Sequence, residues 1–215
     1  MKFKKLGVII TLLCTTSLLW VGCTKEKDIS LEKPDPVQVT YTEDPNQEKF
    51  SQTMILAEKG DVEAQYNLAW MYSNGEGVEK NETISAEWFQ KAASQGHVKA
   101  QYNLGVMYRD GEGVQLDHMQ AVALFEQASN QGYAPAQYNL GSMYIEGKGV
   151  TQNDATAVEW FQKAANQDLA TAQYNLGYMY YHGRGVSQDT NIAKELFQKA
   201  AEQGNTDAQH YLSLI

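Results

Sequence analysis

The side chains best suited to chemistry are the histidines, the cysteines and the carboxylates, and their spacing predicts no catalytic centre. The histidines stand at unrelated positions without a His-x-x-x-His pair, so we interpret each as a surface residue. They are His97, His118, His182 and His210. Both cysteines, Cys14 and Cys23, lie near the N-terminus, which leaves no Cys-x-x-Cys metal motif. With no recurring carboxylate pair either, we expect no enzyme activity, no metal site and no cofactor.

A Gly-x-Gly-Val sequence that occurs four times is the one pattern that could suggest phosphate binding. A phosphate loop contains a Lys followed by Ser or Thr, and this pattern lacks that pair. It also follows a helical segment and carries an acidic residue in two copies, Glu76 and Glu112. Its regular recurrence indicates a structural turn. The copies are residues 75–78, 111–114, 147–150 and 183–186.

The pentapeptide Ala-Gln-Tyr-Asn-Leu sets the period of the chain. Each copy begins 36 residues after the one before it, and a fifth, altered copy reads Ala-Gln-His-Tyr-Leu. A constant period in this range indicates one structural unit repeated in tandem, which is the sequence signature of a solenoid. The copies begin at Ala64, Ala100, Ala136, Ala172 and Ala208.

Each unit has the pattern of two helices. In the second unit, Leu104, Met107 and Tyr108 share one helical face. Gly111 then ends this helix, and Asp117 is placed to cap the next one. We expect a short first helix and a longer second helix. Because neither can hide its apolar face alone, consecutive units must stack.

Two details of the repeat concern packing. A small residue occupies one position of every first helix, which should let two helices approach closely at a cost near 1 kcal/mol for each glycine. This position holds Ala69, Gly105, Gly141 and Gly177.

At the end of the third unit, Asp168 replaces the glycine of the other units. It should cost roughly 1 kcal/mol if the backbone there is left-handed.

The N-terminal segment has the composition of a secretion signal. A basic start precedes about fourteen mostly apolar residues, fewer than the roughly 20 that a membrane span needs. Residues 19–23 resemble a bacterial lipobox, which implies that Cys23 is lipidated and anchors the chain in a membrane. Trp20 departs from the leucine of that pattern, so a cleaved soluble form and an uncleaved anchored form stay open. Thr24 after the cysteine implies, by the same resemblance, the outer membrane facing the periplasm.

The boundaries follow from these signals. We expect a signal peptide at 1–22, a flexible, proline-containing tether at 23–45 and an N-terminal capping helix at 46–60. Four repeats should follow at 61–96, 97–132, 133–168 and 169–204, and a C-terminal capping helix at 205–215. Net charge is −9, or −12 without the first 22 residues, so we expect no nucleic acid partner.

The repeated residues resemble the Sel1-like repeats, which are relatives of the tetratricopeptide repeats. The matching features are Ala-Gln-Tyr-Asn-Leu-Gly, Met-Tyr, Gly-x-Gly-Val, the Asp or Asn cap, Trp-Phe-Gln-Lys-Ala-Ala and Gln-Gly. The resemblance implies an all-α fold, a right-handed α-solenoid whose first helices line a concave groove. It also implies a scaffold for protein–protein recognition. We expect a monomer that binds a protein or peptide.

Comparison of the four copies separates fold from recognition. Positions that repeat identically serve the common fold, whereas positions that differ are free to contact a partner. The groove face of the first helices holds such variable positions, together with a constant tyrosine that could be structural or could touch a partner. Tyr, Trp and Arg are enriched at binding hot spots. The candidate partner-binding residues are Trp70, Tyr102, Val106, Arg109, Ile145, Tyr174, Tyr178 and Tyr181.

Other interpretations remain open at this stage. The same residues could form a solvated rim without a ligand, and the convex face could bind instead of the groove. Some Sel1-like proteins are linked to neutralising secreted effector enzymes, which makes an immunity or inhibitor protein the second candidate. A penicillin-binding or cell-wall-active protein is the third. The family branch linked to penicillin binding has a disulfide in every repeat, and this chain lacks those cysteines.

Overall fold

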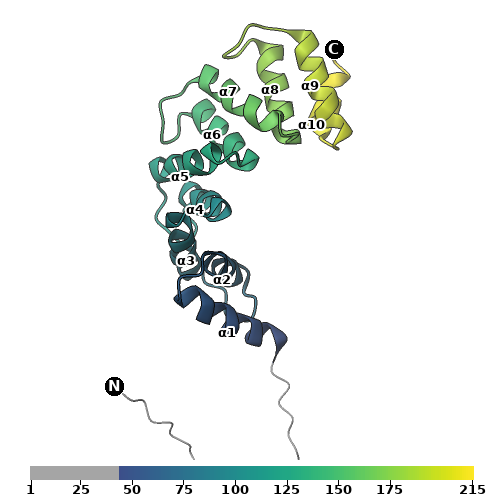
Figure 1. Ribbon diagram of the computed structural model, residues 1–215. Coiled ribbons are helices and arrows are strands. Elements are labelled where there is room, and N and C mark those ends of the chain that lie inside the picture. The colour runs from purple at the N-terminus through teal and green to yellow at the C-terminus, as the bar shows by residue number, and fades with distance from the viewer. Residues whose placement is uncertain (1–43) are drawn as a thin grey trace, which may run out of the picture. The chain divides into compact units, whose positions relative to one another are not determined.

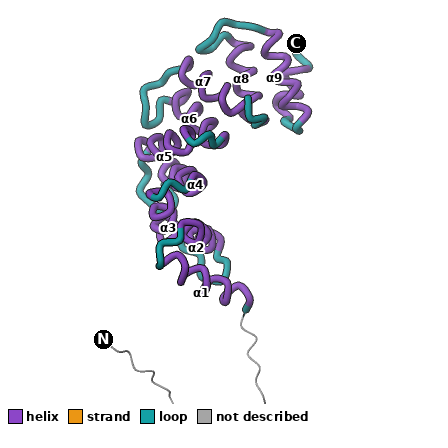
Figure 2. Tube along the Cα trace, viewed as in Figure 1, coloured by secondary structure: helices purple, strands orange, loops and turns teal. Residues whose placement is uncertain are grey.

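The computed structural model describes residues 44–215, which form ten α-helices and no strand (Figure 2). The expected signal peptide, Cys23 and nearly all of the expected tether lie outside the described residues. The helices are α1 Pro45–Glu58, α2 Val62–Asn74, α3 Glu82–Ser94, α4 Val98–Asp110, α5 His118–Asn130, α6 Ala134–Glu146, α7 Asp154–Ala165, α8 Ala170–His182, α9 Thr190–Glu202 and α10 Thr206–Leu212.

The helices pack in chain order, each against the helix before it and the helix after it (Figure 1). We call α2, α4, α6, α8 and α10 the A helices, and α1, α3, α5, α7 and α9 the B helices. Each A helix from α2 to α8 packs more extensively on the B helix that follows it than on the one that precedes it. This arrangement confirms the all-α solenoid.

The expected difference in helix length is absent. The A helices α2, α4, α6 and α8 have 13 residues, and the B helices α3, α5, α7 and α9 have 12 or 13. The prediction of a longer second helix is wrong because the A helix continues to the first glycine of the turn. The B helix starts only after its cap.

The turn between an A helix and its B helix is fixed by a glycine and a capping side chain. Helix α4 ends at Gly111, which has φ 74° and donates its N–H to the carbonyl oxygen of Met107. Helix α5 begins where the Asp117 carboxylate accepts the N–H groups of Met119 and Gln120. Such a cap contributes about 0.5–2 kcal/mol. The caps of the four B helices are Asn81, Asp117, Asn153 and Asp189.

A buried glutamine joins each of the A helices α2, α4, α6 and α8 to both neighbouring B helices. In α4, the Gln101 amide donates to the carbonyl oxygen of Ala93 on α3, at 3.2 Å. Its own oxygen accepts the amide of Gln131, just after α5, at 2.7 Å. The polar side chain is therefore satisfied although it is buried, as buried amides require. The same link is made by Gln65 with Gln95, Gln137 with Gln167, and Gln173 with Gln203.

A small residue lets each A helix lie directly on its B helix. A Cβ atom on Gly141 of α6 would lie 2.7 Å from Cε1 of Phe161 on α7, closer than real Cβ contacts. The ring of Phe161 is buried in the core. The same contact relates Gly105 to Phe125 and Gly177 to Phe197. The glycines thus leave room for the phenylalanine ring between two closely packed helices.

The stop of helix α7 uses a residue other than glycine. Asp168 has φ 59° and is the one non-glycine residue with positive φ among residues 44–215. The left-handed conformation is therefore retained, as in the other repeats. Its carboxylate also accepts the amide of Gln173 at 3.2 Å. This hydrogen bond offsets part of the backbone strain.

Two of the histidines have structural surroundings. His97 is half-buried, and its Nδ1 accepts the N–H of Ala100, so that it caps α4. Its ring stacks on Tyr66 with the centroids 4.5 Å apart, and Nε2 lies 3.1 Å from Oε2 of Glu63. His118 is half-buried at the start of α5. The expectation of simple surface residues therefore does not describe His97 and His118.

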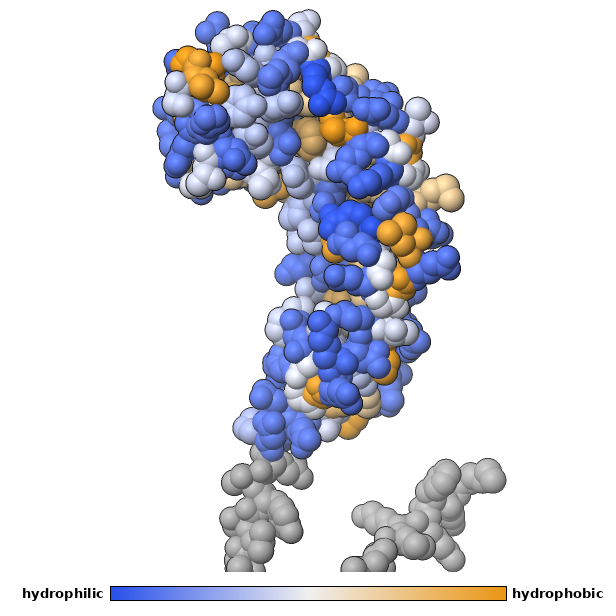
Figure 3. Space-filling model, turned by 180° about the vertical axis from the view of Figure 1, so that it is seen from behind, coloured by the Kyte–Doolittle hydropathy of each residue, from blue (hydrophilic) through white to orange (hydrophobic). Residues whose placement is uncertain are grey.

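The surface is polar and acidic. Six of the 17 basic and five of the 26 acidic residues precede residue 44, so the described residues carry 11 basic and 21 acidic side chains. On the face opposite to that of Figure 1, hydrophilic residues dominate and apolar ones form small separate patches (Figure 3). None of the helices in residues 44–215 has both the length and the apolar character that crossing a membrane requires.

Candidate functional site

The A helices leave one side of their surface outside the core. Their buried stripe, such as Ala100, Leu104 and Met107 in α4, packs against the B helices. The eight residues predicted to contact a partner lie outside this stripe, and none of them is fully buried. Trp70 is the most open, with 45% of its surface exposed. The structure therefore leaves all eight residues at least partly accessible.

The structure brings two of these residues, Trp70 and Val106, to the same pocket. The pocket has a volume of about 250 Å³ and lies between α2, α3 and α4. Its apolar lining includes Phe89 and Met107, both of which belong to the core. We call it the Trp70 pocket; its lining residues are Trp70, Ser73, Asn74, Glu82, Phe89, Asn103, Val106, Met107 and Glu112.

The charged part of the Trp70 pocket is acidic. Glu82 is the first residue of α3, and Glu112 lies between the two glycines of the next turn. Lys80 pairs with Glu82, with 2.7 Å between Nζ and Oε1. Hydrogen bonding to Glu82, its negative charge and the charge of Glu112 raise the pKa of Lys80. One ammonium group thus faces two carboxylates, and the pocket keeps a negative charge.

A second group of predicted residues meets where α4 and α6 adjoin. The Arg109 guanidinium donates to the Asn139 side-chain oxygen at 2.9 Å and to both carboxylate oxygens of Asp110 at 2.7 and 2.6 Å. The amide of Asn139 in turn donates to the hydroxyl of Tyr102 at 3.3 Å. The hydrogen bonds and charge of Arg109 lower the pKa of Asp110. Arg109 and Tyr102 are thereby held in place at the surface of the A helices.

The predicted tyrosines of α8 surround one aromatic ring of α10. The ring of Tyr211 lies 6.0 Å from Tyr174, 5.9 Å from Tyr178 and 5.7 Å from Tyr181. Burial, and then the neighbouring phenols and Asp207, raise the pKa of Tyr174 and of Tyr211. The cluster is half-buried, so these tyrosines both pack the stack and present polar hydroxyl groups.

The remaining predicted residue, Ile145, has a mainly structural environment. It is half-buried and packs against the core formed by α7 and α8, and it belongs to none of the three groups. Tyr102, Val106, Tyr174 and Tyr181 likewise pack against the cores beside them. The eight residues therefore do not form one continuous site. They divide into the Trp70 pocket, the Arg109 network and the tyrosine cluster, with Ile145 beside the core.

Several residues of these groups were not anticipated from the sequence. Glu82 is on a B helix, whereas the helical-wheel argument considered A helices alone. Asn139 occupies the asparagine position of the repeated pentapeptide, which looked constant and hence structural, and Tyr211 stands at the same position of the altered fifth copy. The signal that could have identified them is the neighbouring repeat, since each side chain contacts the A helix before its own.

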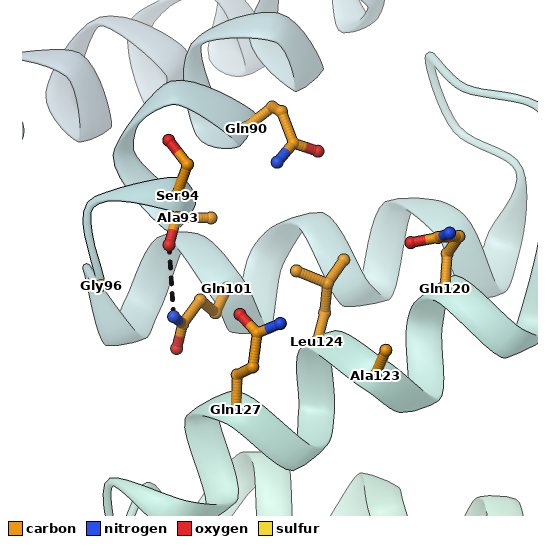
Figure 4. Close-up of a pocket in the computed structure, with 9 residues that line it drawn as sticks. All are labelled: Gln90, Ala93, Ser94, Gly96, Gln101, Gln120, Ala123, Leu124 and Gln127. Atoms are coloured by element: carbon orange, nitrogen blue, oxygen red, sulfur yellow. Dashed lines mark hydrogen bonds between the residues drawn. The ribbon is translucent and has the colours of Figure 1, made fainter.

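A larger cavity of about 400 Å³ lies between α3 and α5 (Figure 4). Its lining includes Gln90, Gln120 and Gln127, and it contains neither a charged nor an aromatic side chain. The Gln101 amide at its edge already donates to the Ala93 carbonyl oxygen, as the dashed line in Figure 4 marks. The cavity therefore offers polar, neutral groups and lacks the anchoring side chains of the Trp70 pocket.

The described residues contain no group of three or more His, Cys, Asp or Glu side chains that could hold a metal ion. What residues 44–215 do bring together is a set of shallow, partly apolar surfaces with fixed aromatic and charged side chains. Such surfaces suit recognition of another molecule.

Comparison with known proteins identifies the repeats. The family model described as Sel1 repeat matches four consecutive segments: 62–97, 98–133, 134–169 and 170–205. Each begins one residue after the boundary expected from the sequence. The comparison with curated proteins gave no match.

Solved structures share this fold. A protective antigen of uropathogenic Escherichia coli with an SLR fold is 42% identical, with a TM-score of 0.72, over 74% of this chain and 34% of its own. A Sel1 repeat protein from Oxalobacter formigenes is 38% identical, with a TM-score of 0.71, over 79% of this chain and 49% of its own. This chain thus spans about a third and about half of their lengths.

A third similar structure is an immunity protein from Pseudomonas aeruginosa. It is 24% identical over 85% of this chain and 65% of its own, with a TM-score of 0.50. This likeness concerns the fold alone.

Proposed function

Because the chain belongs to the Sel1 repeat family, we propose that it is a non-enzymatic scaffold that binds a segment of another protein along its A helices. The partner contacts the Trp70 pocket, the Arg109 network and the tyrosine cluster. Repeated positions hold the stack together, and the positions that differ between repeats select the partner. The acidic surface of residues 44–215 disfavours nucleic acid, whose phosphates would be repelled.

The observation that carries this proposal is the exposure of Trp70. A tryptophan that is 45% exposed forgoes much of the stability that burial would give. Its repeat equivalents, Val106, Ser142 and Tyr178, differ in chemistry, so the shared fold does not dictate a tryptophan there. At protein interfaces, tryptophan is among the residues that carry most of the binding energy.

Alanine substitutions at Trp70 and Tyr178 test the proposal. The double variant should lose capture of the partner from a cell-envelope extract while its helical circular dichroism stays unchanged. The matched control is Met119→Ala, which removes another large exposed apolar side chain, from α5. Equal capture by wild type and double variant would refute a role for these residues. Loss of the helical signal would show that they belong to the core.

We further propose that the scaffold is attached to the cell envelope through lipid on Cys23, facing the periplasm. Support comes from the sequence: a basic start, an apolar run and a lipobox-like segment before Cys23. The proline-containing stretch that follows would give reach between membrane and repeats. Growth with an alkyne-bearing fatty acid should label the wild-type chain and leave Cys23→Ala unlabelled. Equal labelling of both would contradict lipidation at this residue.

A further inference from the structure

We infer that the Trp70 pocket binds an arginine side chain of the partner segment. This inference rests on the proposed function and names the chemistry that the pocket recognises. It follows from a comparison of equivalent positions in the repeats, because one of those positions already holds an arginine of this chain.

Two residues 72 positions later in the chain, near α7 and α9, show how an arginine is bound at the equivalent place. Arg184 lies between the two glycines of its turn, and Asp154 is the first residue of α7. The guanidinium donates from Nε and Nη2 to the two oxygens of Asp154, both at 3.1 Å. Paired contacts of this kind are the favoured geometry between arginine and a carboxylate.

In the Trp70 pocket the same two positions are both acidic. Glu82 corresponds to Asp154, and Glu112 corresponds to Arg184, each 72 residues earlier in the chain. Gly113 lies against the backbone of Glu82, just as Gly185 lies against that of Asp154. The local backbone arrangement is therefore the same, but a carboxylate stands where the other repeat has a guanidinium. Two carboxylates that line one pocket favour a cation between them.

Among residues 44–215, the cation paired at the pocket is Lys80, which does not balance the two carboxylates. Lys80 pairs with Glu82 from the loop before α3, and its side chain is 62% exposed. It leaves the second carboxylate uncompensated, in a stack with ten more acidic than basic residues. A positively charged segment of a partner is therefore complementary both to the pocket and to the surface around it.

The rest of the pocket fits arginine in particular. Trp70 offers an exposed aromatic ring, and the planar guanidinium stacks on such rings. Val106 and Met107 provide apolar surface for the aliphatic part of the side chain. A volume of about 250 Å³ is large enough for one side chain of a partner segment.

The test uses the peptide acetyl-Gly-Arg-Gly-amide and its citrulline counterpart, which has the same shape without the charge. The indole N–H signal of Trp70 in the ¹⁵N-labelled full chain is followed by NMR at low salt, and Trp70→Phe assigns it. We expect the arginine peptide to change the chemical shift of this signal saturably at millimolar concentration. The citrulline peptide should leave the chemical shift unchanged. The double variant Glu82→Gln and Glu112→Gln should weaken binding about tenfold.

The matched control is Glu126→Gln with Glu159→Gln, which removes the same charge from α5 and α7 outside the pocket. It should bind the arginine peptide as the wild type does. Equal shifts with arginine and citrulline, or equal weakening in both double variants, would overturn the inference. If that happens while alanine at Trp70 and Tyr178 still abolishes partner capture, the scaffold function stands and the arginine assignment alone fails.

Discussion

Replacement of Gly141 by alanine tests the close contact between an A helix and its B helix. Alanine is the better helix former by about 1 kcal/mol, so helix propensity alone predicts a more stable protein. The added Cβ atom, however, would lie 2.7 Å from Cε1 of Phe161 and 3.3 Å from the carbonyl oxygen of Ala157. Both neighbours are buried, so neither can move aside freely.

Overpacking of this kind typically costs about 1–3 kcal/mol. Subtracting the gain in propensity, we expect Gly141→Ala to destabilise the protein by up to about 2 kcal/mol. Urea unfolding followed by circular dichroism at 222 nm measures this as a lower midpoint. Phe161→Leu in the same chain should remove most of the added cost, because the clash is with the ring.

The first repeat supplies the control. Ala69 already occupies the equivalent position and is fully buried. Ala69→Gly should destabilise by about 1–2 kcal/mol through helix propensity and the loss of a buried methyl group. If Gly141→Ala instead raised the urea midpoint by the equivalent of about 1 kcal/mol of stability, the gain in helix propensity would outweigh the clash with Phe161. The explanation of the glycines as spacers would then be wrong.

Three further substitutions test local features of the stack. Asp168→Gly should stabilise the protein by up to about 1 kcal/mol, because glycine adopts the left-handed conformation without strain, although the hydrogen bond from Gln173 is lost. A lower urea midpoint would contradict this. Asp117→Ala should cost about 0.5–2 kcal/mol because α5 loses its cap, and an unchanged midpoint would show that the cap contributes nothing. The pKa of Asp110 is lower in the folded than in the unfolded state, so the ionised carboxylate stabilises the fold above about pH 4. This stabilisation is lost as the pH falls through the folded-state pKa. Asp110→Asn should therefore be slightly less stable than wild type at pH 6 and equally stable near pH 2. The difference in the free energy of unfolding at pH 6 should be below about 1 kcal/mol, because the pair with Arg109 is exposed. A difference of the same size at both pH values would refute the pairing.

Most of the fold could be predicted because the repeat presents each signal several times. The period of 36 residues, the glycine that ends α2, α4, α6 and α8, and the Asn or Asp that begins each B helix are local features. They act within a few residues of the backbone they shape. The retained left-handed backbone at Asp168 shows that the stack imposes the repeat geometry even on a less suitable residue.

The cap at His97 was missed for a chemical reason. A histidine at this position accepts the Ala100 N–H through Nδ1, a role usually filled by Asp, Asn, Ser or Thr. The equivalent residues are Asp61, Tyr133, Leu169 and Asn205, and of these only Asp61 and Asn205 are usual cap residues with a side-chain cap hydrogen bond. No pattern across the repeats therefore identified the position.

The candidate site could be predicted only in part, because it depends on contacts between repeats. Trp70 and Val106 share a pocket because equal positions of successive A helices lie beside each other. Glu82 reaches that pocket from a B helix, which a helical wheel of α2 or α4 cannot show. The distribution of the eight residues over separate groups likewise follows from packing between hairpins and not from any one helix.

Site-specific photocrosslinking tests most directly whether the A helices form the recognition surface. A benzoylphenylalanine in place of Val106 would stand in the Trp70 pocket, and one in place of Ala123, an exposed residue of α5, would stand at the cavity between the B helices α3 and α5. Irradiation of living cells should yield a discrete protein adduct from position 106 and none from position 123. Adducts from position 123 alone, or equally from both positions, would contradict the assignment of recognition to the A helices.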